Sequence, residues 1–233
     1  MVLERLDLIY ILINPRREKS RMDRLIPHLL QRGIPVEKIA ISGPTWGDEL
    51  TNEQIFRFYD PFCRQGVPVL TFKARCFSRG EISLVLNFIS GLTDAVTKNM
   101  KTVLFLESDV FLREDFVERL ETILTKLEAE PDWDYVSLGE GARTRPPGHD
   151  HSFFGETKLY SPPHEFVFRC TDSMLFHGKF LKKIIHTIVP FRECLDWELN
   201  LQHMFHKSKA LWADPPLVEQ GTSCGRIVTH LTA

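Results

Sequence analysis

The chain has 233 residues, of which 43% are hydrophobic and 26% are charged, and its formal net charge is −2. This is the composition of a globular protein with one large α/β domain or two small ones. It lacks the basic excess of most nucleic-acid-binding proteins, and no apolar run is long enough to span a membrane. The five cysteines show no C-x-x-C spacing, so we expect reduced thiols and a cytoplasmic protein.

Strand-like apolar runs alternate with segments of helical periodicity along the chain. Strands are expected at 6–13, 38–42, 69–72, 102–108, 134–139, 165–170 and 172–177. Helices are expected at 20–33, 52–59, 81–96, 114–128, 179–188 and 196–207, and Pro27 should kink the first of them or delimit its first turn. The segment 140–165 reads as a long loop, and the chain from Trp212 onward reads as an extended tail.

This alternation predicts an α/β fold built from right-handed βαβ units. We expect a Rossmann-like, mostly parallel central sheet flanked by helices, with a smaller part of mixed strands near the C-terminus. Such sheets bind ligands beyond the carboxyl ends of their strands, so the residues that directly follow strands are the first candidates for a site.

An acidic pair ends the strand at 102–108. Glu107 and Asp109 flank Ser108, and the helix that a capping aspartate would serve is not expected before Glu114. Unpaired charges are rarely buried, so the pair calls for a partner. Two carboxylates at i and i+2 on a tight turn can converge on Mg²⁺ or Mn²⁺, which take oxygen ligands. The pair therefore predicts a divalent metal site.

A charged run, NPRREKSR, follows the first strand at 14–21. Such runs are usually solvated helix starts. Arginine, however, presents a fork that suits phosphate oxygens, and the run lies at the carboxyl edge of the sheet. This position favours a phosphate-binding role for Arg16 and Arg21.

Two later features are candidates for the same site. Asp196, in the segment LDWELN, is equally compatible with a helix N-cap and with a general base, and Glu198 lies beside it. His230 follows an apolar pair near the tail and is a candidate third metal ligand. The segment GTSCG at 221–225 matches G-x-S-x-G, but it lacks the strand–turn–helix context and the acid that a nucleophile elbow requires.

Several segments in order resemble glycosyltransferase family 25, which includes bacterial lipooligosaccharide and collagen galactosyltransferases. INPRREKSRMDRL resembles the family's opening I-N-L-x-R-R…R, RGEIS resembles its G-E-I-G step, and VLFLESDV resembles its L-I-L-E-D-D-V. DYVSLG, CTDSMLF, LDWELN and PPLVEQ follow in the family's order, so that the resemblance spans residues 8–220. The chain departs from the family at Ser108, at Asn87–Phe88 in place of an S-H pair, and in a missing aromatic residue of CTDSMLF. Its compact form is also similar to glycosyltransferase domains of large DNA viruses.

The resemblance implies a single GT-A-type domain over 1–233, with a nucleotide-binding half at 1–112 and an acceptor-binding half at 113–233. It implies metal-dependent, inverting transfer of a sugar from a UDP-sugar to a glycan or glycoconjugate hydroxyl, in the host cytoplasm for a viral member. Glu107 and Asp109 would hold Mn²⁺ or Mg²⁺, with His230 as a third candidate ligand, and Asp196 would be the base beside Glu198. The residues placed near the donor are Ile13, Asn14, Arg16, Arg21, Ser42, Gly43, Arg79, Glu81 and Ser108.

Two other functions stay open at this point. One is a non-catalytic protein that binds nucleotide sugars or carbohydrates. The other is a nucleotidylyltransferase, which usually carries a glycine-rich basic loop after the first strand, whereas NPRREKSR contains no glycine. The donor sugar, the acceptor and the oligomeric state are not specified by the sequence.

Overall fold

The computed structural model describes residues 3–61, 76–141, 155–162 and 170–228. The strand expected at 69–72 and almost all of the one expected at 165–170 lie outside these residues, as does His230.

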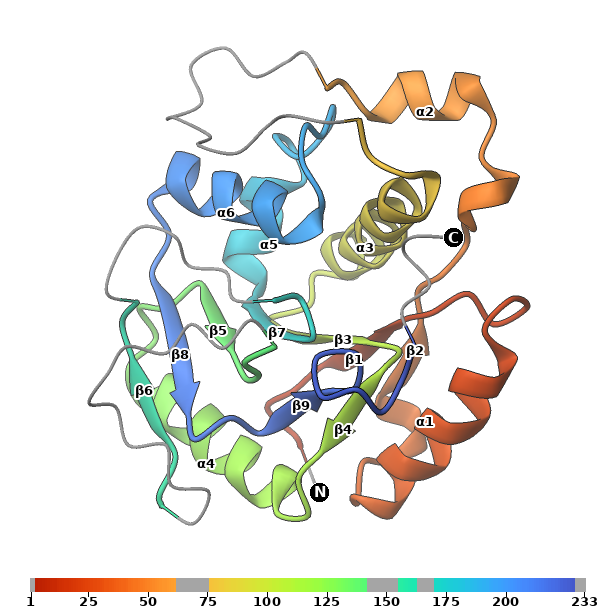
Figure 1. The fold of residues 1–233 in the computed structure, drawn as a ribbon. Helices are drawn as coiled ribbons and strands as arrows, with labels where there is room; N and C mark the ends of the chain where they lie inside the picture. The colour runs from red at the N-terminus through yellow and green to blue at the C-terminus, as the bar shows by residue number, and fades with distance from the viewer. Residues whose placement is uncertain (1–2, 62–75, 142–154, 163–169, 229–233) are drawn as a thin grey trace.

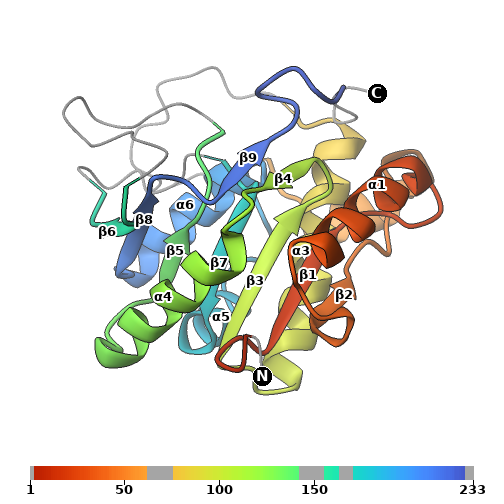
Figure 2. The same ribbon diagram turned by 90° about the horizontal axis from the view of Figure 1, so that it is seen from below.

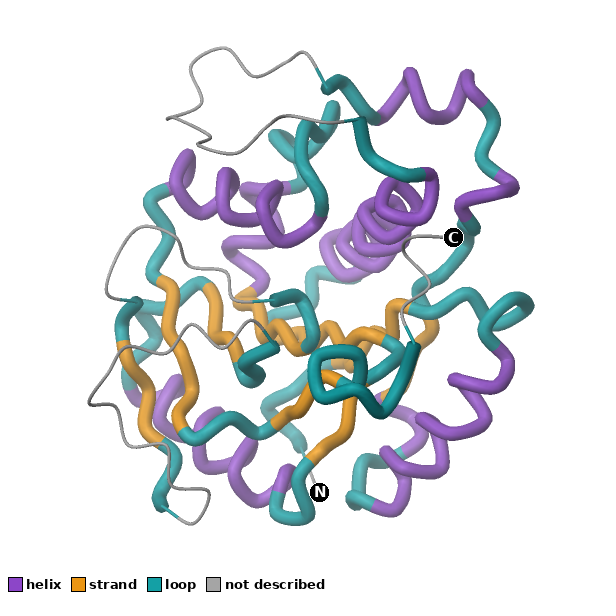
Figure 3. Tube along the Cα trace, viewed as in Figure 1, coloured by secondary structure: helices purple, strands orange, loops and turns teal. Residues whose placement is uncertain are grey.

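The strands in the described residues form a seven-stranded sheet, in the order β2-β1-β3-β7-β5-β8-β6, and a separate two-stranded sheet, β4-β9. Figure 3 shows the larger sheet crossing the centre of the molecule. The strands are β1 (Leu8–Leu12), β2 (Ile39–Ile41), β3 (Thr102–Glu107), β4 (Val110–Leu112), β5 (Tyr135–Ser137), β6 (Lys158–Tyr160), β7 (Ser173–His177), β8 (Ala210–Asp214) and β9 (Val218–Gln220).

Most strands of the larger sheet run in one direction. Parallel pairing joins β1 to β2, β1 to β3, and β5 to β8. The exceptions are β7, which runs antiparallel between β3 and β5, and β6, which is antiparallel at one edge. The prediction of a mostly parallel sheet flanked by helices is confirmed, and the mixed C-terminal strands extend this same sheet.

Helices cover both faces of the sheet. Figures 1 and 2 show α3, α5 and α6 on one face and α1 and α4 on the other. The helices are α1 (Lys19–Gln31), α2 (Asn52–Phe58), α3 (Arg79–Thr97), α4 (Phe116–Ala129), α5 (Gly178–Ile184) and α6 (Leu195–His206), with 3-10 turns η1 (Val36–Lys38) and η2 (Gly47–Glu49). Pro27 lies inside α1 and does not delimit its first turn. No helix of the described ranges has the length and apolar character of a membrane span.

The period-two alternation of each strand divides the core into two layers. In β3, Leu104 and Leu106 pack in the cluster that contains α1 and α4 residues, whereas Val103 and Phe105 pack in the cluster on the α3 side. Phe105 lies 4.8 Å from Phe88 of α3, measured between ring centroids. Burial on both faces explains why the sequence of β3 is a continuous apolar run, with no alternation of polar residues.

Candidate functional site

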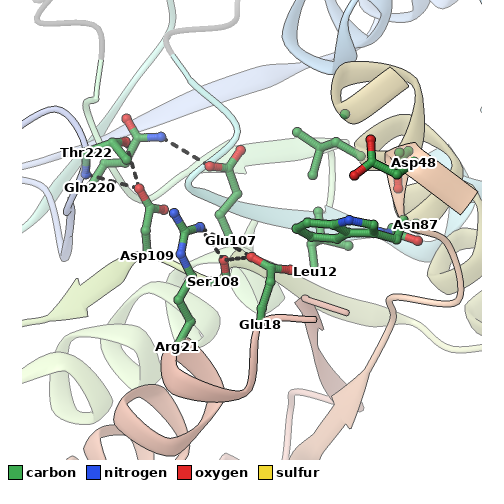
Figure 4. A pocket seen from close by; sticks show the side chains of 15 residues that line it. Leu12, Glu18, Arg21, Asp48, Asn87, Glu107, Ser108, Asp109, Gln220 and Thr222 are labelled. Atoms are coloured by element: carbon green, nitrogen blue, oxygen red, sulfur yellow. Dashed lines mark hydrogen bonds and ion pairs between the residues drawn. The ribbon is translucent and has the colours of Figure 1, made fainter. Parts of the chain in front are cut away.

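A pocket opens at the carboxyl ends of β1 and β3, which lie side by side because Leu12 pairs with Glu107. The pocket is lined from the start of α1, the η2 loop, α3, the β3–β4 turn and the segment after β9 (Figure 4). It encloses about 110 Å³. Sites that enclose a whole ligand measure several hundred Å³, so the described walls suit a hydrated cation or one group of a larger ligand.

The acidic turn forms one side of this pocket. Glu107 is the last residue of β3, and Asp109 directly precedes β4, so that both carboxylates rise from the same turn (Figure 4). The carboxylate of Glu107 accepts hydrogen bonds from the Thr171 hydroxyl and from Nε2 of Gln220, the latter at 3.1 Å. Burial, followed by repulsion from Asp109, raises the pKa of Glu107 to about 8.

The carboxylate of Asp109 is only partly satisfied. Its Oδ2 atom accepts hydrogen bonds from the backbone N of Thr222 at 3.1 Å and from the hydroxyl of Thr222 at 2.7 Å. Its Oδ1 atom is buried and has no hydrogen-bond partner among the described residues. A buried carboxylate oxygen without a partner is costly, and a cation would remove that cost.

Two carboxylates at one pocket are the kind of oxygen ligands that a hard divalent cation takes. Mg²⁺ commonly takes one or two carboxylates and completes its shell with water and substrate phosphates. No group of three or more His, Cys, Asp or Glu side chains suited to a metal occurs in the described residues. His230, the predicted third ligand, lies outside them.

Ser108 is explained by its contacts with α1. Nη1 of Arg21 donates a hydrogen bond to the Ser108 hydroxyl at 2.9 Å, and that hydroxyl lies 3.2 Å from Oε1 of Glu18. Oε2 of Glu18 in turn accepts a hydrogen bond from the backbone N of Asn14 at 2.9 Å. Ser108 thus connects the acidic turn to the segment after β1.

The opposite wall is the loop from Gly43 to Asp48, which Thr45 fastens to α3. Oδ1 of Asn87 accepts hydrogen bonds from the backbone N of Thr45 at 2.9 Å and from its hydroxyl at 2.8 Å. Nδ2 of Asn14 donates to the carbonyl of Thr45 at 3.1 Å. These bonds fix the loop that contributes Trp46 and Asp48 to the pocket, and they assign a structural role to Asn87.

Of the residues predicted near the donor, Arg21 and Ser108 line the pocket. Arg16 lies at the surface, where its guanidinium is 3.2 Å from the carboxylate of Glu49. Oδ1 of Asn14 accepts hydrogen bonds from the two backbone amides that follow Pro15, each at 3.1 Å, and so shapes the approach to α1. The remaining members of the β1 and β2 ends, Ile13, Ser42 and Gly43, are buried beneath the pocket wall.

Gly43 is required by close packing between the ends of β1 and β2. A Cβ atom at this position would lie 1.7 Å from the carbonyl oxygen of Ile13. The Ser42 hydroxyl donates to the carbonyl of Asn87 at 2.6 Å, which ties β2 to α3. These residues place the wall and do not themselves line the pocket.

Arg79 and Glu81 organise the N-terminus of α3. The guanidinium of Arg79 donates to the carbonyl of Leu50 and, at 3.0 Å, to Oδ1 of Asn52. Glu81 and Ser78 form a capping box, in which Ser78 N donates to the Glu81 carboxylate at 2.8 Å and Glu81 N donates to the Ser78 hydroxyl at 3.2 Å. The S-x-x-E pattern of this motif is readable in the sequence.

Asp196 and Glu198 lie in the first turn of α6, in different surroundings. Asp196 is half-buried, and its Oδ1 accepts hydrogen bonds from Trp197 N at 2.9 Å and from the Cys194 thiol at 3.0 Å. Burial, then the charges of Glu107, Asp172 and Asp196, raise the pKa of the Cys170 thiol. Asp196 and Glu107 are thus both near Cys170, but neither Asp196 nor Glu198 lines the pocket. Glu198 is fully buried and paired with Arg192.

The sequence did not reveal several pocket residues. Gln220 and Thr222 hold the two acids, but they lie more than 100 positions away from them along the chain. Gln220 ends the PPLVEQ segment of the family resemblance, which was the available signal. Glu18 stands among basic residues in NPRREKSR, and Trp46 and Asp48 lie in a loop without a motif, so no local pattern marks these three residues.

Comparisons with known proteins add little to this geometry. No family model and no curated protein matches the chain. Among solved structures, A197 from STIV is 13% identical, with a TM-score of 0.43 over 91% of this chain and 82% of that one. The CMP:2-keto-3-deoxy-manno-octonic acid synthetase complexed with CTP is 12% identical, with a TM-score of 0.40 over 88% of each chain. At these TM-scores neither likeness bears on what this protein binds.

Proposed function

We propose that the protein is a metal-dependent glycosyltransferase that moves a sugar from a nucleotide-diphosphate donor, a UDP-sugar, to a glycan or glycoconjugate hydroxyl with inversion. The observation that carries the proposal is the acidic turn: Glu107 and Asp109 share one pocket, and Oδ1 of Asp109 is buried without a partner among the described residues. The resemblance to glycosyltransferase family 25 supplies the donor class.

The charge of the pocket supports a role for a cation. In the described residues the pocket is lined by four acidic side chains, those of Glu18, Asp48, Glu107 and Asp109, against one arginine, Arg21. An anionic diphosphate would be repelled by this surface unless a cation lay between them. Glu107 and Asp109 would hold Mn²⁺ or Mg²⁺, which when bound stabilises the charge that develops on the departing diphosphate by several kcal/mol.

Asp196 is the proposed general base. It lies in the first turn of α6, and both it and Glu107 of the acidic turn are near Cys170. Removal of the acceptor's proton by such a carboxylate typically contributes about 10²- to 10⁴-fold to the rate. Glu198, with its buried ion pair to Arg192, would hold the start of α6 in place for Asp196.

The alternative functions have less support. A nucleotidylyltransferase would bind a triphosphate through the basic segment after β1, but Arg16 and Arg17 of that segment face Glu49 at 3.2 Å and 2.7 Å. A non-catalytic nucleotide-sugar-binding protein would share the pocket and the metal. It differs from the enzyme only in the absence of turnover.

The test has two stages. A panel of UDP- and GDP-sugars is first screened by thermal shift with Mn²⁺ present, where a true donor at 100 times its Kd should stabilise the fold by about 2.7 kcal/mol. The selected donor is then assayed for UDP release with and without Mn²⁺, in the wild-type protein and in Asp109→Asn. Glu219→Gln is the matched control, because Glu219 lies on β9 close to the site but pairs with Arg226 at the surface.

We expect Mn²⁺-dependent UDP release by the wild type and by Glu219→Gln, and its loss in Asp109→Asn. Full metal-dependent turnover by Asp109→Asn would refute the metal assignment. Binding of a nucleotide sugar without turnover, in the presence of acceptor glycans, would favour the binding protein. Release of pyrophosphate from a nucleoside triphosphate would favour the nucleotidylyltransferase.

A further inference from the structure

Along one edge of β4, side chains of α1 supply the hydrogen-bond partners that a neighbouring strand would normally supply to the backbone. The other edge of β4 pairs with β9, where the Asp109 carbonyl accepts from Gly221 N at 2.9 Å and Arg113 N donates to Leu217 O at 3.1 Å. Backbone groups alternate in direction along a strand, so those of Ser108, Val110 and Leu112 face away from β9 and towards α1.

Arg24 and His28 of α1, together with Arg32 at the C-cap of the helix, supply partners for these groups. The guanidinium of Arg24 donates to the carbonyls of Ser108 at 2.8 Å and Val110 at 3.0 Å. Nε2 of His28 accepts from Leu112 N at 2.8 Å, and Nε of Arg32 donates to Leu112 O at 3.2 Å. We call Arg24, His28 and Arg32 the α1 ladder.

The spacing of the α1 ladder follows from helix and strand geometry. Four residues of α-helix advance about 6 Å, and two residues of strand advance about 6.6 Å. Arg24 and His28, four apart on α1, therefore meet Val110 and Leu112, two apart on β4, and Arg32 reaches the carbonyl of the same Leu112. The ladder supplies partners to an edge that would otherwise expose unpaired backbone groups.

Arg24 has a special place in this ladder, because the two carbonyls that it joins lie on either side of Asp109. Its guanidinium lies 4.5 Å from the centroid of the Phe111 ring, and burial lowers its pKa. It does not line the pocket. Arginine can bridge two acceptors with its planar fork, whereas lysine is a point donor on a flexible stem.

We propose that Arg24 is a positioning residue for the metal site: by bridging the carbonyls of Ser108 and Val110 it holds the turn in which Asp109 faces the pocket. This role rests on the proposed metal-dependent function. Outer residues that orient metal ligands typically account for about 10- to 100-fold of metal affinity or activity.

A positioning role and a purely electrostatic role predict opposite results. Arg24 is a positive charge beside Asp109, so its charge alone repels a cation from the site. Arg24→Gln removes the charge and the fork, and Arg24→Lys keeps the charge but removes the fork. If only the charge mattered, Arg24→Gln would bind the cation more tightly and Arg24→Lys would be unchanged. If the bridge matters, both variants bind the cation more weakly.

The experiment is a titration with Mn²⁺ alone, in which electron paramagnetic resonance measures the free ion, on the wild type, Arg24→Lys, Arg24→Gln and Arg32→Gln. Arg32→Gln is the matched control, since Arg32 donates to the far end of the same strand. Circular dichroism melts establish that each variant is folded. Arg24→Lys keeps the charge and an aliphatic stem beside Phe111, and decides the question if Arg24→Gln does not fold.

We expect Mn²⁺ to bind about 10- to 100-fold more weakly to both Arg24 variants, and with wild-type affinity to Arg32→Gln. Unchanged affinity in Arg24→Lys would overturn the positioning role, whatever Arg24→Gln shows. Equal losses of Mn²⁺ affinity in Arg24→Lys and Arg32→Gln would also overturn it, because the effect would then not be specific to the bridge that Arg24 makes. If the wild type does not bind Mn²⁺, the metal assignment itself fails, and the role of Arg24 fails with it.

Discussion

Two buried carboxylates, Asp109 and Glu198, differ in what surrounds their charge. Glu198 accepts hydrogen bonds from the guanidinium of Arg192 at 3.1 Å, from Arg192 N at 2.8 Å and from Gln202 Nε2 at 2.9 Å. Asp109 receives two hydrogen bonds from Thr222 at a single oxygen, and its other oxygen has no partner in the described residues. The protein supplies hydrogen-bond donors to both oxygens of the Glu198 carboxylate, whereas Oδ1 of Asp109 has no donor among the described residues, although Arg24 places a positive charge nearby.

This difference separates a structural acid from a binding acid. A buried carboxylate with a full set of donors serves the fold, and removal of its partner or of itself disrupts local structure. A buried carboxylate at a pocket with an unused oxygen costs stability unless a ligand is present. The sequence does not distinguish a structural acid from a binding acid. Asp196 and Glu198 lie in the same helical turn, and only their surroundings in the structure differ.

The largest effect is expected for Glu198→Ala. The substitution leaves the Arg192 guanidinium and the Arg192 backbone amide without their partner, and breaking a buried ion pair typically costs about 3–5 kcal/mol. Urea denaturation measures the loss. Asp196→Asn, in the same turn, is the control, and we expect it to keep most of its stability and to lose turnover. An unchanged urea midpoint in Glu198→Ala would show that its ion pair is dispensable.

Asp109→Asn should show the reverse pattern. The substitution removes a charge whose Oδ1 atom is buried without a partner in the described chain, so the metal-free protein should be at least as stable as the wild type. Loss of about 3 kcal/mol of metal stabilisation corresponds to roughly a 100-fold fall in metal-dependent turnover. Melts without metal and rates with Mn²⁺ test the two halves. Destabilisation by several kcal/mol without metal would make Asp109 a structural acid like Glu198.

His203 is a third buried titratable group, in which the protein keeps the neutral form. Its ring lies 4.8 Å from that of Phe180 and 4.9 Å from that of Tyr135, and burial lowers its pKa from 6.5 to about 3. The unfolded chain takes up a proton below pH 6.5 that the folded chain refuses down to about pH 3. His203 therefore lowers stability as the pH falls through this window, by about 1.4 kcal/mol per pH unit.

Denaturation at a series of pH values measures this slope. Because His203→Leu has no proton to bind at this position, we expect its stability to fall less steeply between pH 6.5 and 3. The same slope in the wild type and the variant would mean that other groups account for the acid sensitivity.

The smallest effect concerns the capping box at the start of α3. Ser78→Ala removes the acceptor for Glu81 N and should cost about 1 kcal/mol. Glu81→Gln can keep the capping box, so it should retain stability and the thermal shift produced by the donor. A lost donor shift with unchanged stability would instead place Glu81 in contact with the donor, as the family resemblance implies.

The helices and strands that could be predicted from the sequence are those whose pattern of apolar residues lies within the element itself. The apolar run of β1 and the helical spacing of α3 arise within the elements themselves, because each is buried on a regular set of positions. β4 and β9 were missed because each has three residues and its partner lies far away in the sequence. β6 and β8 were missed because their pairing connects two segments that lie far apart in the sequence and were read as loop and tail.

The site divides in the same way. Glu107 and Asp109 could be predicted because charged residues at the end of a buried apolar strand are costly unless they have a partner, and this pattern is visible within a few residues of sequence. Arg24 could not, since in the sequence it resembles any polar residue of an amphipathic helix. Its role depends on a strand edge more than 80 positions away, and no pattern within α1 encodes that edge.

The α1 ladder limits how this chain can change in length. One residue inserted between Arg24 and Arg32 would turn the later rung about 100° around the helix, away from β4. An insertion of four residues, about one helical turn, would point the Arg32 side chain towards β4 again. It would also move that side chain about 6 Å along the strand, past the end of β4. Insertions and deletions are therefore expected in the connections around this helix, while the eight-residue interval from Arg24 to Arg32 stays constant.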